Sequence, residues 1–178
     1  MTEARTAALR DRVSARMRDI PDFPKPGVLF KDITPVLLDP QLFGDVISWM
    51  AEGWSGVDRI VAMESRGFLF AAPLVERMNA GLVLARKRGK LPYATVGVDY
   101  ALEYGTAHLE VHVDAISPGQ RVLVIDDLLA TGGTADATIQ LVRKTGGHVV
   151  GCCFLVELGF LKGRAKLDVP VRSLVTVG

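Results

Sequence analysis

Two neighbouring acids followed by a bend of small residues form the segment of this sequence best suited to chemistry. An apolar run at 122–125 ends in Asp126 and Asp127, and Leu128-Leu129-Ala-Thr-Gly-Gly-Thr follows. Glycines tolerate positive φ, so the backbone N–H groups of this bend can turn toward one point, and the start of a helix favours an anion there. The residues predicted to bind a phosphate are Ala130, Thr131, Gly132, Gly133 and Thr134.

The acids beside this bend need a partner other than the phosphate, because carboxylates repel it. A ribose supplies one, since its hydroxyls can donate to Asp126 and Asp127. The order of acids and bend therefore predicts a ribose followed by its 5′-phosphate. A plainer interpretation, Asx-turns after a strand, suits one aspartate better than two. Walker and dinucleotide glycine patterns are absent, which argues against an NTPase or a dehydrogenase.

A second cluster of charge follows another apolar run. Four cations occur in five residues, and Ser65-Arg66-Gly67 follows a further apolar run at 60–63. Basic runs are often only solvated, and this one could bind nothing. The carboxyl ends of parallel strands, however, meet at one edge of a sheet. The segments together predict a ligand charged at both ends, such as a phosphorylated sugar carrying a diphosphate. The four cations are Arg86, Lys87, Arg88 and Lys90.

The elements that must position these residues alternate along the chain. Each of two units reads strand, loop, helix and strand, which predicts a parallel sheet with right-handed crossovers. We therefore expect an α/β fold with a Rossmann-like open parallel sheet flanked by helices. The expected strands are residues 60–63, 82–85, 122–125 and 149–156, and helices run to Met78 and Lys144.

Three other segments have distinct patterns. Residues 108–114 alternate, which predicts a half-exposed antiparallel strand with Glu110 on its polar face and Val113 on its apolar face. Residues 93–103 are predicted to form a loop that closes as a lid. Three prolines in 20–27 predict a stiff connector without a strand ladder, and Asp39-Pro40 predicts the start of a helix.

Composition limits the remaining possibilities. The 178 residues suit one domain, 1–178, and the formal charge of +1 gives no general field for nucleic acid or a membrane. No apolar run approaches the ~18 residues of a spanning helix, and the first ten residues lack a signal peptide's apolar stretch, so we expect a cytoplasmic protein. Cys152 and Cys153 lie in an apolar run and are predicted to be reduced core residues.

The segment 122–134 resembles the signature of the type I phosphoribosyltransferases. Four more blocks agree with that family and stand in its order, so that the resemblance covers roughly residues 21–161. They are 24–33, 64–70, 86–92 and 102–105, the last being Leu-Glu-Tyr-Gly. Residues 94–99 match no pattern of the family. The resemblance implies the type I phosphoribosyltransferase fold with a small flexible hood.

The resemblance also implies a reaction. Phosphoribosyl pyrophosphate and adenine would give AMP and pyrophosphate, with Mg²⁺ held mainly by ligand oxygens and water rather than by protein ligands. Glu103 on the hood would act as acid or base toward the purine, and Tyr104 would close the pocket. Arg66 would stabilise the leaving group, and the peptide before Ser65 would be strained or cis. The pyrophosphate residues would be Ser65, Arg66, Arg86, Lys87 and Lys90, and the base residues Leu29, Phe30 and Leu128.

Two alternatives compete with this interpretation. One keeps the fold but makes the protein a sensor of phosphoribosyl pyrophosphate that binds nucleic acid or a protein. The roughly twenty residues before Pro21 are too few for a winged-helix module, and the net charge does not support it. The other is a related transferase for a different base, distinguished by the loop at 23–30. The family further implies a homodimer.

Overall fold

The computed structural model describes residues 1–101 and 105–178, so Glu103 and Tyr104 lie outside the described residues. These residues group into two compact units, 1–52 and 53–178. Each unit is described by itself, and the single domain expected from the sequence stays a prediction. No helix in the described ranges is both long and apolar enough to cross a membrane.

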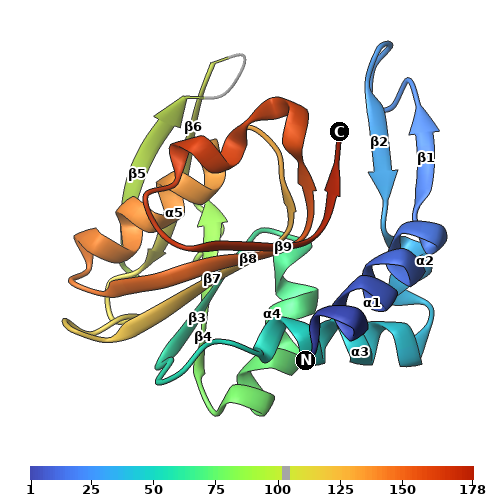
Figure 1. Cartoon of the computed structure of the whole chain (residues 1–178). Coiled ribbons are helices and arrows are strands. Elements are labelled where there is room, and N and C mark those ends of the chain that lie inside the picture. The colour runs from blue at the N-terminus through green and yellow to red at the C-terminus, as the bar shows by residue number, and fades with distance from the viewer. Residues whose placement is uncertain (102–104) are drawn as a thin grey trace. The chain divides into compact units, whose positions relative to one another are not determined.

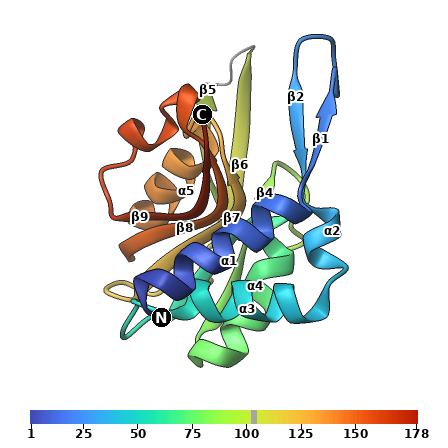
Figure 2. The ribbon, with the colours of Figure 1, turned by 45° about the vertical axis from the view of Figure 1, so that its right-hand side comes forward.

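The unit 1–52 combines helices with a strand hairpin (Figure 2). Its third helix begins as the sequence predicts. The Asp39 carboxylate accepts a hydrogen bond from the Leu42 amide at 3.0 Å, and Pro40 occupies the first helical turn, where a missing N–H costs nothing. The elements are α1 (Glu3–Arg16), β1 (Arg18–Pro21), β2 (Leu29–Asp32), α2 (Thr34–Leu37) and α3 (Pro40–Ala51).

The connector predicted at 20–27 is paired at its first two residues, so the prediction is wrong for Ile20 and Pro21, whereas residues 22–27 form no strand. Strands β1 and β2 pair antiparallel, from Arg18 opposite Asp32 to Pro21 opposite Leu29. The ladder uses the residues on either side of the proline cluster, and only Pro21, at the strand end, takes part in it. Between the strands, the Asp22 carboxylate accepts from the Gly27 amide at 2.7 Å and closes the turn.

The unit 53–178 is an α/β layer structure, as predicted (Figure 1). Its described residues form a seven-stranded sheet of order β5-β6-β4-β3-β7-β8-β9. Within that described sheet, strands β4, β3, β7, β8 and β9 are parallel to one another. Strand β6 pairs antiparallel with β4, and β5 pairs antiparallel with β6. The strands are β3 (Arg59–Met63), β4 (Gly81–Lys87), β5 (Thr95–Ala101), β6 (Thr106–His112), β7 (Arg121–Leu129), β8 (His148–Leu158) and β9 (Val171–Val177).

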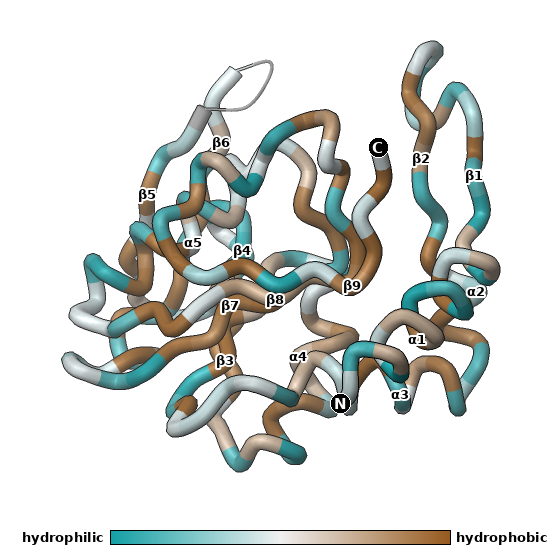
Figure 3. The backbone as a smooth tube through the Cα atoms, viewed as in Figure 1, coloured by the Kyte–Doolittle hydropathy of each residue, from teal (hydrophilic) through white to brown (hydrophobic). Residues whose placement is uncertain are grey.

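Two helices cover opposite faces of this sheet, α4 (Gly67–Met78) and α5 (Gly133–Lys144) (Figure 1). Alternate residues of the central strands, such as Val61, Val124 and Cys152, cluster with Ile139 of α5. Figure 3 shows apolar residues concentrated along these central strands. A strand buried on both faces reads as a continuous apolar run, which explains why the sequence revealed β3 and β7. Both helices begin at the carboxyl ends of strands and so frame the edge where we expect the site.

Strand β7 is longer than predicted. The sequence suggested that it ends at Ile125, whereas the ladder continues with Asp126 opposite Phe154 and Leu128 opposite Val156. The cause is the partner strand β8, whose eleven residues offer backbone groups beyond the two acids. The acids therefore stand on a rigid strand rather than on a loop.

The predicted lid segment also differs. Residues 95–101 form β5, which pairs antiparallel with β6, so the loop expected at 93–103 is wrong for its described part. The alternation predicted for residues 108–114 is only half right, and β6 ends at His112, so Val113 lies beyond the strand. Glu110 is 5% exposed although it was placed on the polar face, and Val113 is 48% exposed although it was placed on the apolar face. Glu110 is buried because backbone and side-chain donors surround its carboxylate.

Candidate active site

The predicted phosphate-binding bend surrounds a small pocket of about 90 Å³, several times what one water needs. Gly132, at φ +81°, stands before the first turn of α5, so the N–H groups of that turn point toward the pocket. Its walls come from the end of β7, the bend and the start of α5. The lining residues are Met63, Asp126, Leu128, Leu129, Ala130, Thr131, Gly132, Gly133, Thr134 and Ala135.

The two acids differ in their surroundings although they are neighbours. Oδ1 of Asp126 accepts a hydrogen bond from the Asp127 amide at 2.9 Å. Burial, and after it the charge of Asp127, raises the pKa of Asp126 well above its ordinary value. Asp127 is 5% exposed and has a cationic partner. The raised pKa of Asp126 favours its protonated form, which can donate as well as accept, and Asp127 accepts a hydrogen bond from a cation.

That cation is Arg66, which follows β3. Its Nε donates to Oδ2 of Asp127 at 2.5 Å, and its side chain remains 41% exposed. Strands β3 and β7 are parallel neighbours, with Ala62 opposite Ile125, so the residues that follow them meet at one edge. The peptide between Glu64 and Ser65 is cis, one of the two forms the resemblance implied.

The basic turn, residues 86–90, is braced by Glu64. Nη2 of Arg86 donates to Oε1 of Glu64 at 3.0 Å and Nη1 to the Lys90 carbonyl at 2.9 Å, while the Lys87 amide donates to Oε2 of Glu64 at 3.2 Å. The Arg86 guanidinium and the Lys87 amide hold the pKa of Glu64 below its usual range. Arg86 therefore shapes the turn that presents Lys87.

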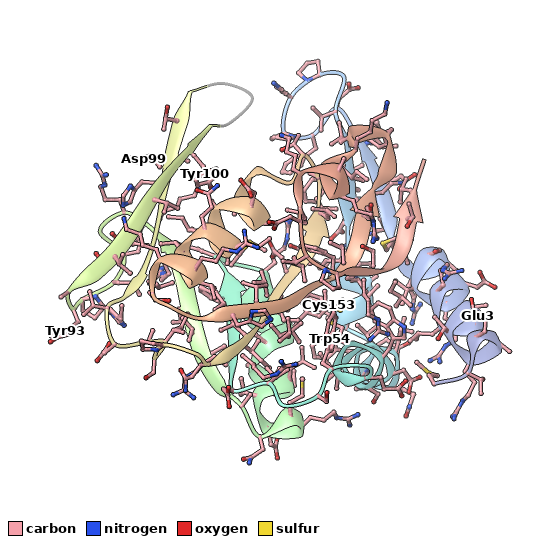
Figure 4. All side chains as sticks on the ribbon, turned by 60° about the vertical axis from the view of Figure 1, so that its left-hand side comes forward. Glu3, Trp54, Tyr93, Asp99, Tyr100 and Cys153 are labelled. Atoms are coloured by element: carbon pink, nitrogen blue, oxygen red, sulfur yellow. The ribbon has the colours of Figure 1, made fainter. Side chains whose placement is uncertain are left out.

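A larger cavity of about 530 Å³ connects the basic turn with the bend. Lys87 and Arg88 line one part of it, and Thr134, which also lines the first pocket, lines another. Oγ1 of Thr134 donates to the Tyr100 hydroxyl at 3.5 Å, and Figure 4 shows Tyr100 beside Asp99 on β5. The predicted phosphate and diphosphate sites thus lie side by side. Of the residues predicted for pyrophosphate, Lys87 lines the larger cavity, whereas Ser65, Arg66, Arg86 and Lys90 line neither cavity.

Sequence reasoning missed Glu110, a buried acid under the basic turn. Its Oε1 accepts from the Gly89 amide at 2.8 Å and its Oε2 from the Thr95 hydroxyl at 3.2 Å. The turn is therefore tied from below by β6 as well as from the side by Glu64. The residue stood in an alternating strand, and nothing in that pattern separates a polar residue facing water from one facing a backbone donor.

The predicted base residues come from both units. Leu29 and Phe30 lie on β2, where the Phe30 ring packs edge-on against Phe23 with centroids 5.1 Å apart. Leu128 lies on β7 and lines the small pocket. Leu29 is 50% exposed, so it is available to a ligand. The catalytic acid or base predicted at Glu103 lies outside the described residues.

Among residues 1–101 and 105–178, no group of three or more His, Cys, Asp or Glu side chains could hold an ion. The acids at the end of β7 are Asp126 and Asp127, and the second is already paired with Arg66; Glu64, in the larger cavity, is paired with Arg86. This donor set fits Mg²⁺ that arrives on a diphosphate and keeps most of its waters, not a caged ion.

The open parallel sheet, the acid pair and the predicted phosphate-binding bend are together typical of a phosphoribosyltransferase. Residues 38–175 match the family model described as the phosphoribosyl transferase domain, and the chain belongs to this family. It is 54% identical over 171 residues to the adenine phosphoribosyltransferase of Anaeromyxobacter dehalogenans. The aligned region covers 94% of this chain and 99% of that protein.

Solved structures agree with this assignment. The adenine phosphoribosyltransferase of Rhodothermus marinus has a TM-score of 0.92 and 48% identity, over 96% of this chain and 99% of that one. The adenine phosphoribosyltransferase of Saccharomyces cerevisiae was solved with an imino-altritol bisphosphate and adenine. It has a TM-score of 0.87 and 37% identity, and the match covers 94% of this chain and 99% of that one.

Proposed function

We propose that this protein transfers the 5-phosphoribosyl group of phosphoribosyl pyrophosphate to adenine, forming AMP and pyrophosphate in purine salvage. The observation that carries the proposal is the bend 130–134, which follows Asp126 and Asp127 at the carboxyl end of β7 and lines a pocket of about 90 Å³. Relatives named adenine phosphoribosyltransferase over nearly the whole chain support the choice of base.

In this proposal the bend binds the 5′-phosphate through backbone N–H groups and the hydroxyls of Thr131 and Thr134. Asp126 and Asp127 bind the 2′- and 3′-hydroxyls of the ribose. Because Asp126 has a raised pKa, it can donate as well as accept, whereas Asp127 accepts while Arg66 offsets its charge. The sugar is thus held between a helix start and two acids on a rigid strand.

The pyrophosphate group occupies the neighbouring cavity near the basic turn. The cations balance its charge, and Arg86 keeps the turn in shape through Glu64 and the Lys90 carbonyl. Arg66 is exposed enough to reach the leaving group while it stays bonded to Asp127. The residues proposed for pyrophosphate are Ser65, Arg66, Arg86, Lys87 and Lys90.

The reaction passes through an oxocarbenium-like ribose, so positive charge develops on the sugar and negative charge on the pyrophosphate. The acids next to the ribose stabilise the first, and the cations stabilise the second. Attack by the purine nitrogen needs no protein nucleophile. Glu103 is proposed to hold or remove the proton of the base. Water must be excluded during this step, and we propose the hood for that role.

Mg²⁺ bound together with phosphoribosyl pyrophosphate would neutralise part of the charge of the leaving group. We propose that it is held by diphosphate and ribose oxygens and by water, without a dedicated protein ligand.

Leu29, Phe30 and Leu128 are proposed to hold the adenine ring. The homodimer and the cytoplasmic location stay predictions, and sedimentation velocity tests the first.

The direct test incubates the purified protein with phosphoribosyl pyrophosphate, Mg²⁺ and one base at a time. We expect AMP from adenine and far slower product formation from guanine or hypoxanthine. A reaction with guanine but not adenine would contradict the assigned base, and no turnover with any base would favour a sensor.

Glu103→Gln should remove a limb of the pH profile of kcat, and an unchanged profile would exclude an acid or base role.

A further inference from the structure

The phosphate-binding bend rests on a glycine that is distant in the sequence. Gly163 begins the short helix η2 (Gly163–Lys166) in the β8–β9 connection, residues 159–170. A Cβ atom on Gly163 would lie 2.1 Å from the Ala130 carbonyl oxygen and 2.8 Å from the Gly132 nitrogen. A Cβ atom on Gly132 would lie 2.4 Å from the Gly163 carbonyl oxygen. The two backbones touch, and neither residue has space for a side chain.

The reasons for glycine differ at these two positions. Gly132 has a φ of +81°, which itself favours glycine, whereas Gly163 is not among the residues with positive φ. An alanine at Gly163 would therefore suit the local backbone and fail only against the bend. The contact with residues 130–132 is the structural reason for glycine there.

The adjacent Arg164 holds the connection in place. Its Nε donates to Oε1 of Glu157 at 3.0 Å, its Nη2 to Oε2 at 2.5 Å and its Nη1 to the Val171 carbonyl at 2.6 Å. Glu157 is 6% exposed on β8, and it pairs in register with Leu129, the last residue before the bend. A two-point guanidinium–carboxylate contact fixes orientation as well as distance.

We propose that Gly163 and Arg164 are positioning residues for the 5′-phosphate. The Gly163 backbone is the wall that keeps the bend in its phosphate-binding shape, and the Arg164–Glu157 pair fixes that wall to the strands beside the bend. The inference rests on the proposed function, which assigns the bend to the 5′-phosphate. Amides that bind a phosphate must point at one spot, and a shift of about 1 Å can cost up to about 100-fold in activity.

The test compares two crowded glycines of the same connection. Gly159 has no positive φ either, and a Cβ atom there would lie 2.6 Å from the Gly178 carbonyl oxygen, away from the bend. Calorimetry with AMP reports binding of a 5′-phosphate, and calorimetry with inorganic pyrophosphate reports the other site. We expect Gly163→Ala to weaken AMP binding and raise KM for phosphoribosyl pyrophosphate about 10- to 100-fold. Pyrophosphate affinity should stay within about twofold, and Gly159→Ala should leave both ligands within the same margin.

Arg164→Ala tests the same proposal if Gly163→Ala does not fold. It should weaken AMP binding and leave the affinity for pyrophosphate unchanged. Arg164→Lys should recover part of the loss, since lysine keeps the charge but cannot make the two-point contact of the guanidinium. Unchanged AMP binding in a folded Gly163→Ala or Arg164→Ala protein would overturn the inference, and so would equal losses for AMP and pyrophosphate. A wild-type protein that binds no AMP and shows no turnover would instead overturn the proposed function and this inference with it.

Discussion

Arg66 and Asp127 join the two central strands of the sheet at the site, because Nε of Arg66 donates to Oδ2 of Asp127 at 2.5 Å. Asp127 is nearly buried, and a carboxylate taken out of water requires a partner of this kind. The Arg66 side chain is 41% exposed and can serve a ligand at the same time. One guanidinium thus holds the acid proposed for the ribose and keeps an exposed part for the proposed contact with pyrophosphate.

Arg66→Ala should therefore affect both catalysis and stability. Loss of one preorganised cation at the leaving group should lower kcat about 10²–10³-fold. Asp127 would lose its partner, which should cost about 1–3 kcal/mol of unfolding free energy, moderated because Arg66 is partly exposed. Steady-state kinetics and urea unfolding measure the two effects. Arg66→Lys, which keeps the charge, should recover stability more than turnover, and a kcat near that of the wild type would exclude Arg66 from the reaction.

Gly132→Ala tests the bend directly, and Gly119→Ala is its matched control. Both glycines have φ near +80°, at +81° and +82°, so alanine meets similar backbone strain of about 1–2 kcal/mol at either position. Only at Gly132 would the new Cβ atom meet another backbone, whereas at Gly119 nothing lies within 4 Å. We expect both variants to lose some stability by thermal unfolding, but only Gly132→Ala to lose AMP binding. Equal AMP affinity in the two would show that the bend does not hold the phosphate.

Glu110 should matter for the affinity of phosphoribosyl pyrophosphate although it contacts no ligand in the proposed function. Glu110→Ala removes the acceptor of the Gly89 amide and of the Thr95 hydroxyl, so the basic turn loses its support from β6. Losing a hydrogen bond to the exposed Gly89 amide costs about 1 kcal/mol, which predicts a KM for phosphoribosyl pyrophosphate roughly fivefold higher. Glu110→Gln retains an acceptor oxygen and should recover most of the loss. A change in kcat alone would assign Glu110 a different role.

The sequence predicts those parts of the fold that depend on local pattern. Apolar runs, a capping Asp39 and the glycine-rich bend each carry their information within a few residues, and the sheet, α3 and the pocket at the end of β7 are found as expected. The adjacent cysteines were also interpreted correctly, since Cys152 and Cys153 are free and buried.

Features set by partners far along the chain could not be predicted in this way. Strand β7 continues through the acids because β8 offers it a ladder, and Glu110 is buried because the Gly89 amide needs an acceptor. Gly163 carries no motif, and its importance appears only where its backbone meets the bend. In each case the deciding contact joins residues twenty or more positions apart, and no local period records it.

The two cysteines should resist thiol reagents in the native protein. Burial raises the pKa of both Cys152 and Cys153 to about 12, and the thiolate is the reactive form. We expect negligible labelling by a thiol reagent at pH 8 under native conditions and two labelled thiols per chain after unfolding in guanidinium chloride. Rapid labelling of the folded protein, measured by mass spectrometry, would contradict the burial of these side chains.

The Arg164–Glu157 pair should make stability depend on pH in the acid range. The Arg164 guanidinium holds the pKa of Glu157 below its usual range, so the folded state favours the carboxylate. The stabilisation is therefore present above the unfolded pKa of about 4.3 and is lost as the pH falls through the lower folded value. Unfolding by urea at pH 7 should show Arg164→Ala to be about 1–3 kcal/mol less stable than the wild type, an effect moderated by the exposure of Arg164.

The difference between the wild type and Arg164→Ala should shrink below pH 4, because the unfolded chain then binds a proton at Glu157 that the folded wild type still resists. Arg143→Ala is the matched control, since Arg143 pairs with Asp168 at 2.9 Å on the surface, where both side chains are about half exposed or more. Solvent screens such a pair, so its loss should leave stability unchanged at either pH. A stability gap for Arg164→Ala that is as large at pH 3.5 as at pH 7 would mean that the guanidinium contributes by packing and by its contact with the Val171 carbonyl, not through the charge of Glu157.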